Sequence, residues 1–392
     1  MIEILVAGND LDYINMMKAE LESIDCKVEV SLQYQDALNK LKHASHIGLV
    51  VVDENVKDMD GKEFCIRLRS EIIQRPVYII FLKEKSHRTE LIDGFDFVAD
   101  DYLNKPFSLE ELEVRIRAGT KIIQLNKKIR AAEEMRQISL KSGREAQESL
   151  LPVNFPDIPG MEIAARFLPS AFVSGDIYNI FRLDENNVGL YNIDVSGHGV
   201  SAALFSVGLS QRLTHNLHPA GLLKVPSDEP PYYRINPPDE VVRVLDEDDM
   251  LGRYGRYFTM VYAIVHLDTD CVSFCRAGHN LPLLLHANGS AEHIDGGGPP
   301  IGLGLSKEGR ESKKIPLASG DEFILFSDGI NESYSQNGKA GYGLQRIKSI
   351  LLEHLDKPLG QSFDFLLKDA KRHHNHKEFS DDISIIGFKW ER

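Results

Sequence analysis

The chain has 392 residues, of which 42% are hydrophobic and 27% charged. A single hydrophobic core rarely serves so long a chain, so at least two domains are expected. The formal net charge of −14 argues against binding to nucleic acid or to anionic membranes, because both need basic surfaces. No run of about 18 apolar residues occurs, so no membrane span is expected. Four scattered cysteines are typical of a reduced, cytoplasmic protein.

Strand and helix signals alternate over residues 1–107. The strands are expected at Ile2–Ala7, Val28–Ser31, Ile47–Val52, Pro76–Leu82 and Phe97–Leu103. The helices are expected at Leu11–Leu21, Gln35–Leu41, Lys62–Arg69 and 86–94. This alternation predicts an α/β domain with a doubly wound, five-stranded parallel sheet covered by helices on both faces. The functional crevice of such a sheet lies at the carboxyl ends of its strands, where Asp53, Lys83 and Lys105 fall.

This pattern resembles the receiver domain of two-component response regulators. Asp53, after four apolar residues, matches the phosphoacceptor, and Met59-Asp60-Gly61 matches the loop that follows it. Lys105, within the segment Asp100–Phe107, matches the invariant switch lysine. The resemblance implies a receiver domain at residues 1–107 and a histidine kinase as a partner.

Two departures from the receiver pattern concern the chemistry at Asp53. Gly8-Asn9-Asp10 stands where receivers place two acidic residues for Mg²⁺, and Lys83 stands where they place a serine or threonine. Phosphoryl transfer needs a cation to offset charge, so we expect weak Mg²⁺ binding and a degenerate receiver, in which Asp53 is phosphorylated poorly or not at all. A phosphorylatable receiver is the alternative to this interpretation. Another alternative is that Lys83 supplies positive charge and mimics an activated receiver.

A helix of about 40 residues is expected to connect the two domains, over residues 108–150. Ser108 and Glu111 form a capping box at its start. Apolar residues keep a 3-4 spacing and then shift to a second seam: Ile122, Leu125, Ile129 and Ala132, followed by Met135 and Ile138. Two heptads followed by a slip predict a weak coiled coil, and we interpret the connector as dimerising. The alternative is a solvated helix packed on its own domains.

The second domain is expected at residues 151–392, after prolines end the connector. Its strands are expected at Met161–Phe167, Ile177–Leu183, Val188–Ile193, Phe258–Leu267, Cys271–Arg276, Pro282–His286, Glu322–Phe326 and Ile383–Phe388. Helical patterns fall at 200–214, 239–250, 343–355 and 361–373. Many strands with helices grouped between them predict an α+β domain with antiparallel sheets.

Aspartates recur beside these strands, at Asp176, Asp194, Asp328 and Asp381. Each one alone could be a turn or cap residue. Carboxylates that converge from separate strands repel one another unless cations lie between them. A cluster that offers only oxygen ligands favours Mg²⁺ or Mn²⁺ over Zn²⁺.

The motifs around these aspartates resemble the metal-dependent PPM serine/threonine phosphatases, in particular their bacterial SpoIIE/RsbU-like branch. The matching segments are Ser174-Gly175-Asp176-Ile177-Tyr178, Asp194–Gly199, Ala277-Gly278-His279-Asn280, Ser327-Asp328-Gly329 and Asp381-Asp382-Ile383-Ser384. The preceding segment, Gln147 with Leu150-Leu151-Pro152, is also typical of the family. The resemblance covers nearly all of 145–392 and implies an antiparallel β-sandwich flanked by helices.

The same resemblance implies a site with two divalent cations, Mn²⁺ or Mg²⁺. Asp194 would bridge them, Asp328 and Asp381 would hold one, and Asp176 with the carbonyl of Val195 would hold the other. Two cations about 4 Å apart activate a shared water for in-line attack on a phosphoserine or phosphothreonine. No protein nucleophile is then needed.

By resemblance, the substrate is a phosphorylated anti-sigma factor antagonist in a partner-switching stress or sigma-factor pathway. The alternative is a non-catalytic adaptor whose phosphatase-like domain binds a sigma factor or an anti-sigma factor. All four principal acidic positions are aspartate here, which favours catalysis. His198 is a minor candidate for the acid that protonates the leaving oxygen, and His279 is expected to be structural.

Overall fold

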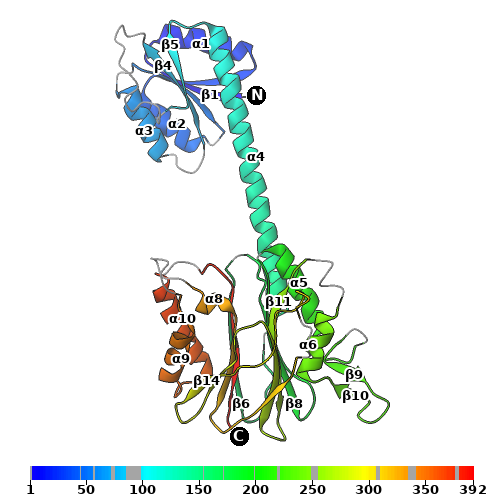
Figure 1. Ribbon diagram of the computed structural model, residues 1–392. Helices are drawn as coiled ribbons and strands as arrows, with labels where there is room; N and C mark the ends of the chain where they lie inside the picture. Colours follow the sequence, from blue (N-terminus) through cyan, green and yellow to red (C-terminus); the bar gives the residue numbers. More distant parts are fainter. Residues whose placement is uncertain are drawn as a thin grey trace. The chain divides into compact units, whose positions relative to one another are not determined.

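The computed structural model describes most of the chain (Figure 1). The residues outside the description are 1, 45, 56–57, 72–75, 85–98, 153, 171, 198, 219–220, 249–254, 306–309, 334–340 and 376–378. The chain divides into two compact units, Met1–Gln137 and Ile138–Arg392, and each has its own hydrophobic core. None of the described helices combines the length and apolar composition needed to cross a lipid bilayer.

The first unit contains a five-stranded, fully parallel sheet in the order β2-β1-β3-β4-β5. Its strands are β1 (Ile2–Ala7), β2 (Cys26–Ser31), β3 (Leu49–Asp53), β4 (Tyr78–Glu84) and β5 (Asp101–Lys105). The doubly wound sheet predicted from the sequence is confirmed. The expected strand Phe97–Leu103 is described only from residue 99, and there β5 begins at Asp101 and runs to Lys105. The expected helix 86–94 lies outside the described residues.

Helices cover both faces of this sheet. They are α1 (Leu11–Ser23), α2 (Tyr34–His43), α3 (Gly61–Glu71) and the start of α4 (Leu109–Glu148). Alternate residues of β1 point to opposite faces, as the strand period requires. Ile4 and Val6 join the core beneath α1 and α4, whereas Leu5 and Ala7 join the core beneath α2 and α3.

Helix α4 is continuous over 40 residues, close to the length expected from the sequence. Its capping box is formed, since Glu111 N–H donates to Ser108 Oγ at 3.2 Å and Ser108 N–H donates to a Glu111 carboxylate oxygen at 3.3 Å. The predicted apolar seam is exposed along the middle of the helix, at Ile122, Leu125, Ile129, Met135 and Ile138. These five side chains are called the connector stripe below.

The second unit contains two five-stranded sheets whose neighbouring strands are antiparallel. The first sheet has the order β15-β12-β11-β8-β7, with strands Lys313–Pro316, Cys271–Ala277, Phe258–His266, Asn187–Val195 and Ile177–Arg182. The second has the order β14-β13-β16-β17-β6, with strands Ala291–His293, Leu283–Leu285, Glu322–Phe326, Ile383–Trp390 and Met161–Leu168. A separate hairpin pairs β9 (Lys224–Pro226) with β10 (Tyr233–Ile235).

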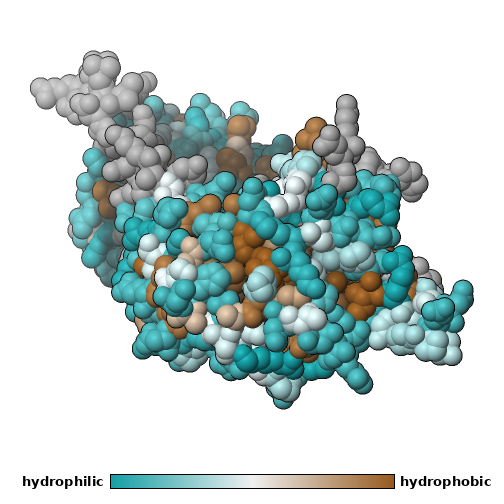
Figure 2. All heavy atoms as spheres, turned by 60° about the horizontal axis from the view of Figure 1, so that its bottom comes forward, coloured by the Kyte–Doolittle hydropathy of each residue, from teal (hydrophilic) through white to brown (hydrophobic). Residues whose placement is uncertain are grey.

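The two sheets pack face to face, and helices cover their outer faces (Figure 1). Helices α5 (Val200–Arg212) and α6 (Pro238–Asp246) cover the first sheet. Helices α9 (Leu344–Glu353) and α10 (Leu359–His373) cover the second, and the short α8 (Asp328–Asn331) follows β16. The result is the helix-flanked antiparallel sandwich that the resemblance implied. On the face shown in Figure 2, hydrophilic side chains cover most of the surface and apolar ones gather in small patches.

Where the structure departs from the sequence prediction, short elements are responsible. Strands β9, β10, β14 and β15 and helix α8 have only three or four residues each, too few to show a period. The strand expected to end at Ile193 continues through Asp194 to Val195, because Asp194 pairs with Thr259 of β11. Asp194 therefore lies within its strand, not just beyond it.

Candidate metal centre

Four aspartates are carried to one place by two pairs of neighbouring strands. Asp176 immediately precedes β7 and Asp194 lies near the end of β8, both in the first sheet. Asp328 begins α8 directly after β16, and Asp381 lies two residues before β17, both in the second sheet. Asp176 is buried, Asp194 and Asp328 are half-buried, and Asp381 is exposed. The cluster therefore has a buried end and a solvent-facing end.

The carboxylates of this cluster oppose one another's ionisation. Burial, followed by the charges of Asp328, Asp381 and Asp382, raises the pKa of Asp194 to about 7. Burial and then Asp381 and Glu332 raise the pKa of Asp328 to about 6. Burial and the neighbouring Asp194 raise the pKa of Asp176 well above its ordinary value. This is the surplus of negative charge that a bound cation would relieve.

Two glycines allow the backbone segments of the cluster to approach closely. A Cβ atom on Gly175 would lie 2.8 Å from the carbonyl oxygen of Val195, so the loop before Asp176 packs against the carbonyl of Val195. A Cβ atom on Gly329 would lie 2.0 Å from the carbonyl oxygen of Asp382, which no side chain could tolerate. The Asp-Gly pairs noted in the sequence therefore serve packing between the segments that carry the aspartates.

Hydrogen bonds from the second sheet fix the segment that carries Asp176. The hydroxyl of Ser384, on β17, donates to Asp176 Oδ2 at 2.7 Å. Asp382 accepts from Ser170 N–H at 2.7 Å through Oδ1 and from Gly175 N–H at 2.9 Å through Oδ2. Both oxygens of Asp382 are thus engaged with the loop before Asp176. Asp382 acts as a support beside the cluster.

The donors suit a hard divalent cation by their chemistry. All four side chains offer carboxylate oxygens, which Mg²⁺ and Mn²⁺ prefer, and the Val195 carbonyl lies next to the Asp176 loop. Within the described ranges, no group of three or more His, Cys, Asp or Glu side chains is already placed so that it could hold a metal ion. The match between these four aspartates and a divalent cation therefore rests on two observations: burial and neighbouring aspartates raise the pKa values of Asp176, Asp194 and Asp328, and all of the donor atoms are oxygens.

His279 lies next to the strand that carries Asp194. Its Nδ1 is 2.8 Å from the hydroxyl of Thr259, the residue that pairs with Asp194 across β8 and β11. Burial, and then the charge of Arg276, lowers the pKa of His279 to about 3, so the ring is neutral at physiological pH. A neutral, buried imidazole supports the strand but does not supply a proton. His198, the other histidine considered, lies outside the described residues.

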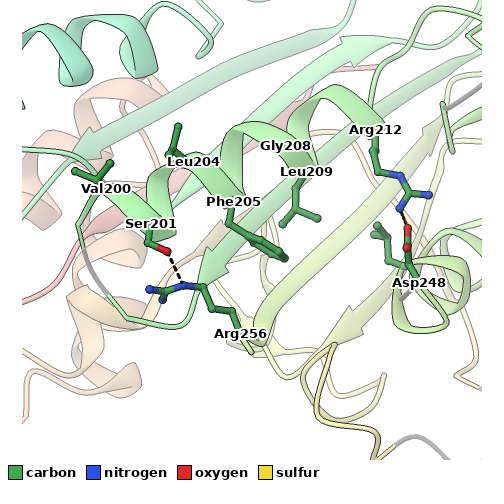
Figure 3. A pocket seen from close by; sticks show the side chains of 10 residues that line it. Val200, Ser201, Leu204, Phe205, Gly208, Leu209, Arg212, Asp248 and Arg256 are labelled. Carbon is green, nitrogen blue, oxygen red and sulfur yellow. Dashed lines mark hydrogen bonds and ion pairs between the residues drawn. The ribbon is translucent and has the colours of Figure 1, made fainter. Parts of the chain in front are cut away.

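Beside the cluster, the loop after Asp194 leads into an apolar cavity of about 490 Å³ along α5 (Figure 3). Val200, Leu204, Phe205 and Leu209 line it among others, and an Arg212–Asp248 ion pair lies at one end. At the other end Arg256 donates to the Ser201 hydroxyl at 3.3 Å and to the Ser196 carbonyl. Arg256 thus fixes the turn after Asp194. No sequence pattern drew attention to it, because its partners are 55 and 60 residues away.

The first unit has its own acidic site at the carboxyl end of its sheet. Asp53 ends β3 and is 3% exposed, and Lys105 at the end of β5 places Nζ 2.6 Å from Asp53 Oδ2. Lys105 Nζ is also 3.4 Å from Glu84. Asp10 caps α1, accepting from Tyr13 N–H at 3.1 Å through its side chain. The sheet brings Asp53 and Lys105 together, while Asp10 serves the helix.

Comparison with known proteins agrees with both architectures. The stage II sporulation protein E (SpoIIE) family matches residues 184–391, more than half of the chain, and the response regulator receiver domain family matches residues 4–117. Protein IcfG of Synechocystis sp. is 23% identical over 264 residues, which cover 64% of this chain and 41% of that protein. Phosphoserine phosphatase RsbP of Bacillus subtilis is 23% identical over 226 residues, covering 58% and 51%. The chain therefore spans about half the length of these curated relatives or less.

A solved structure shows the same fold in the second unit. The SiaA-PP2C domain of Pseudomonas aeruginosa superposes with a TM-score of 0.55 and 19% sequence identity, covering 67% of this chain and 99% of that domain. Together with the family matches, the sandwich and the parallel sheet settle the assignment. The chain belongs to the SpoIIE family of PPM-type phosphatase domains, here joined to a response regulator receiver domain.

Proposed function

We propose that this chain is a metal-dependent protein phosphatase acting on phosphoserine or phosphothreonine. The observation that carries the proposal is the cluster of Asp176, Asp194, Asp328 and Asp381, in which burial and mutual repulsion raise the pKa of Asp194 to about 7. A structural turn residue gains nothing from such an arrangement, whereas carboxylates that share a cation are commonly gathered in this way.

The role that we propose for each aspartate depends on which pair of neighbouring strands it belongs to. Asp194 would be shared by two cations, Asp328 and Asp381 would hold one of them, and Asp176 with the Val195 carbonyl would hold the other. When bound, two Mn²⁺ or Mg²⁺ ions activate water and offset the charge of the transferring phosphoryl group.

The chain's own residues orient this set. Ser384 fixes the carboxylate of Asp176, and Asp382 fixes the loop before it. Arg256 fixes the turn after Asp194 by binding the Ser196 carbonyl. Prepositioned ligands lower the cost of assembling the site when metal and substrate arrive.

The proposed substrate is a phosphorylated anti-sigma factor antagonist in a partner-switching pathway. This rests on the resemblance to the RsbU-like branch and on the similarity to RsbP, a phosphoserine phosphatase. The acidic overall charge of −14 also fits a protein substrate better than a nucleic acid.

The receiver and the connector are proposed to regulate this activity. Asp53 is the proposed phosphoacceptor, with Lys105 as its switch lysine and a histidine kinase as the partner. Mg²⁺ binding is expected to be weak, because Asp10 caps α1 and neither Gly8 nor Asn9 offers a carboxylate. The exposed connector stripe is proposed to form a homodimer through α4.

The experiment is a phosphate-release assay with the full-length protein, treated with EDTA and then supplied with Mn²⁺. A phosphoserine peptide and a phosphorylated anti-sigma factor antagonist serve as substrates, and Asp194→Asn is the control. Release that depends on Mn²⁺ and disappears in Asp194→Asn is expected. No release from either substrate, together with no Mn²⁺ binding, would overturn the proposal in favour of a non-catalytic adaptor.

A further inference from the structure

Gln147 lies in the last turn of α4, where this helix belongs to the second unit and lies beside α5 (Figure 1). Its side chain is only 5% exposed. Its amide pairs with both backbone groups of one residue, because Nε2 donates to the Ser174 carbonyl at 2.6 Å and Oε1 accepts from Ser174 N–H at 2.9 Å. Nε2 also lies 3.3 Å from the hydroxyl of Ser206, on α5.

Ser174 is two residues from Asp176 and is linked to it directly. The Ser174 hydroxyl accepts from Asp176 N–H at 3.0 Å. The intervening Gly175 donates its N–H to Asp382 and packs against the Val195 carbonyl. Within the segment that ends in Asp176, Gln147 therefore holds Ser174 and Asp382 holds Gly175.

The two bonds to Ser174 constrain the loop as a neighbouring strand would. Ser174 is fully buried, so its N–H and carbonyl have no access to water if the amide is removed. Buried backbone groups left unpaired are unfavourable, so the loop would move to satisfy them. Any such movement is transmitted to the adjacent Asp176.

We propose that Gln147 is a positioning residue for the metal centre, setting the place of Asp176 through the backbone of Ser174. The inference rests on the proposed function, because Asp176 matters here as a cation ligand. Supporting residues of this kind change metal affinity without touching the metal.

The test is the binding of Mn²⁺ to the full-length protein, followed by the loss of the electron paramagnetic resonance signal of free Mn²⁺. Gln147→Met keeps the volume of the side chain but removes every polar contact. We expect its Mn²⁺ dissociation constant to rise about 10- to 100-fold. Gln124→Met, at an exposed glutamine of the same helix, is the matched control and should bind Mn²⁺ like the native protein.

A second variant distinguishes positioning from mere folding. A glutamic acid at this place, Gln147→Glu, can form both bonds to Ser174 when protonated but only the accepting one when ionised. The ratio of its Mn²⁺ dissociation constant to that of the native protein should therefore fall between pH 8 and pH 6. Dividing the dissociation constant of the variant by that of the native protein at each pH removes the contribution that the aspartates' own titration makes to both.

The outcomes separate this inference from the proposed function. If the native protein does not bind Mn²⁺, the proposed metal centre fails and the inference fails with it. Native binding with unchanged affinity in Gln147→Met, even at a lower melting temperature, would overturn the inference alone. If Gln147→Met does not fold, an equal Gln147→Glu ratio at the two pH values would overturn it.

Discussion

The two units each gather carboxylates at the ends of strands, but they balance the charge in opposite ways. In the receiver, Asp53 is paired within the chain by Lys105, whose Nζ lies 2.6 Å away. In the phosphatase domain, the charges that shift the pKa of Asp194 most are those of three further aspartates. A site that carries its own counter-ion is complete as folded, whereas a cluster of like charges requires protons or a cation from outside.

The largest expected effect comes from removing the central carboxylate. Asp194→Asn should lower phosphatase activity by about 10³-fold or more, because the metal ions supply several kcal/mol of transition-state stabilisation. The metal-free variant should unfold at no lower temperature than the native protein at pH 8, because one of several repelling charges is gone. Full activity in this variant would contradict the assignment of Asp194.

The cluster should also make the stability of the metal-free protein depend on pH. The pKa values of Asp194 and Asp328 are raised to about 7 and about 6, so the folded state binds more protons than the unfolded state. Their contribution to stability is complete at low pH and is lost as the pH rises through these values.

Thermal unfolding in EDTA and in Mn²⁺ measures this difference. The melting temperature gained on adding Mn²⁺ should be larger at pH 8 than at pH 5.5, because the cation replaces protons that are absent at pH 8. Asp194→Asn should reduce the difference between the two pH values. An equal gain at both pH values in the native protein would argue against a metal site here.

In the receiver, removing the charge next to the buried carboxylate should lower stability, whereas in the aspartate cluster removing a neighbouring charge should not. Lys105→Ala should destabilise the first unit by about 3 kcal/mol, because it leaves the buried charge of Asp53 without its partner. Asp53→Asn should cost less, since an amide can remain beside the lysine. Urea unfolding of the full-length protein measures both, and a smaller loss in Lys105→Ala than in Asp53→Asn would refute this account of the pair.

Asp53 phosphorylation should be limited by the missing acidic residues. Labelling of the native protein by a small phosphodonor should be weak even with Mg²⁺, and Asn9→Asp should increase it by restoring a cation ligand. Gln35→Glu, which adds a charge on the exposed face of α2, is the control. Strong Mg²⁺-dependent labelling of Asp53 in the native protein would show that the receiver site is not degenerate.

The smallest effect on stability is expected in the connector. Ile129→Asp changes an exposed member of the connector stripe, so it should dissociate the proposed dimer while leaving the melting temperatures of both units nearly unchanged. Analytical ultracentrifugation measures the mass, with Lys128→Ala as an exposed control on the same helix. A monomeric native protein would refute dimerisation through the stripe.

The sequence was sufficient for features encoded by local pattern. Apolar period and turn residues located the strands that carry Asp53 and Asp194 and the strand that precedes Asp328. The capping box of α4 was visible in Ser108 and Glu111. Long elements were predicted well because many residues repeat the same signal. Strands of three residues, such as β13, gave only an approximate position, because pairing with β16 and β14 decides their ends.

Only the tertiary structure decided which partners these residues take. The sequence marked Asp10 as a remaining acidic residue, but the fold uses its side chain as the cap of α1. It marked Gln147 and Asp382 as parts of motifs, and the fold bonds both of them to the Ser174–Asp176 segment. Asp382 and Gly175 are 207 residues apart, so no local pattern could reveal their bond. Local periodicity determines where the helices and strands lie along the chain. The packing of the two sheets determines which strand ends meet.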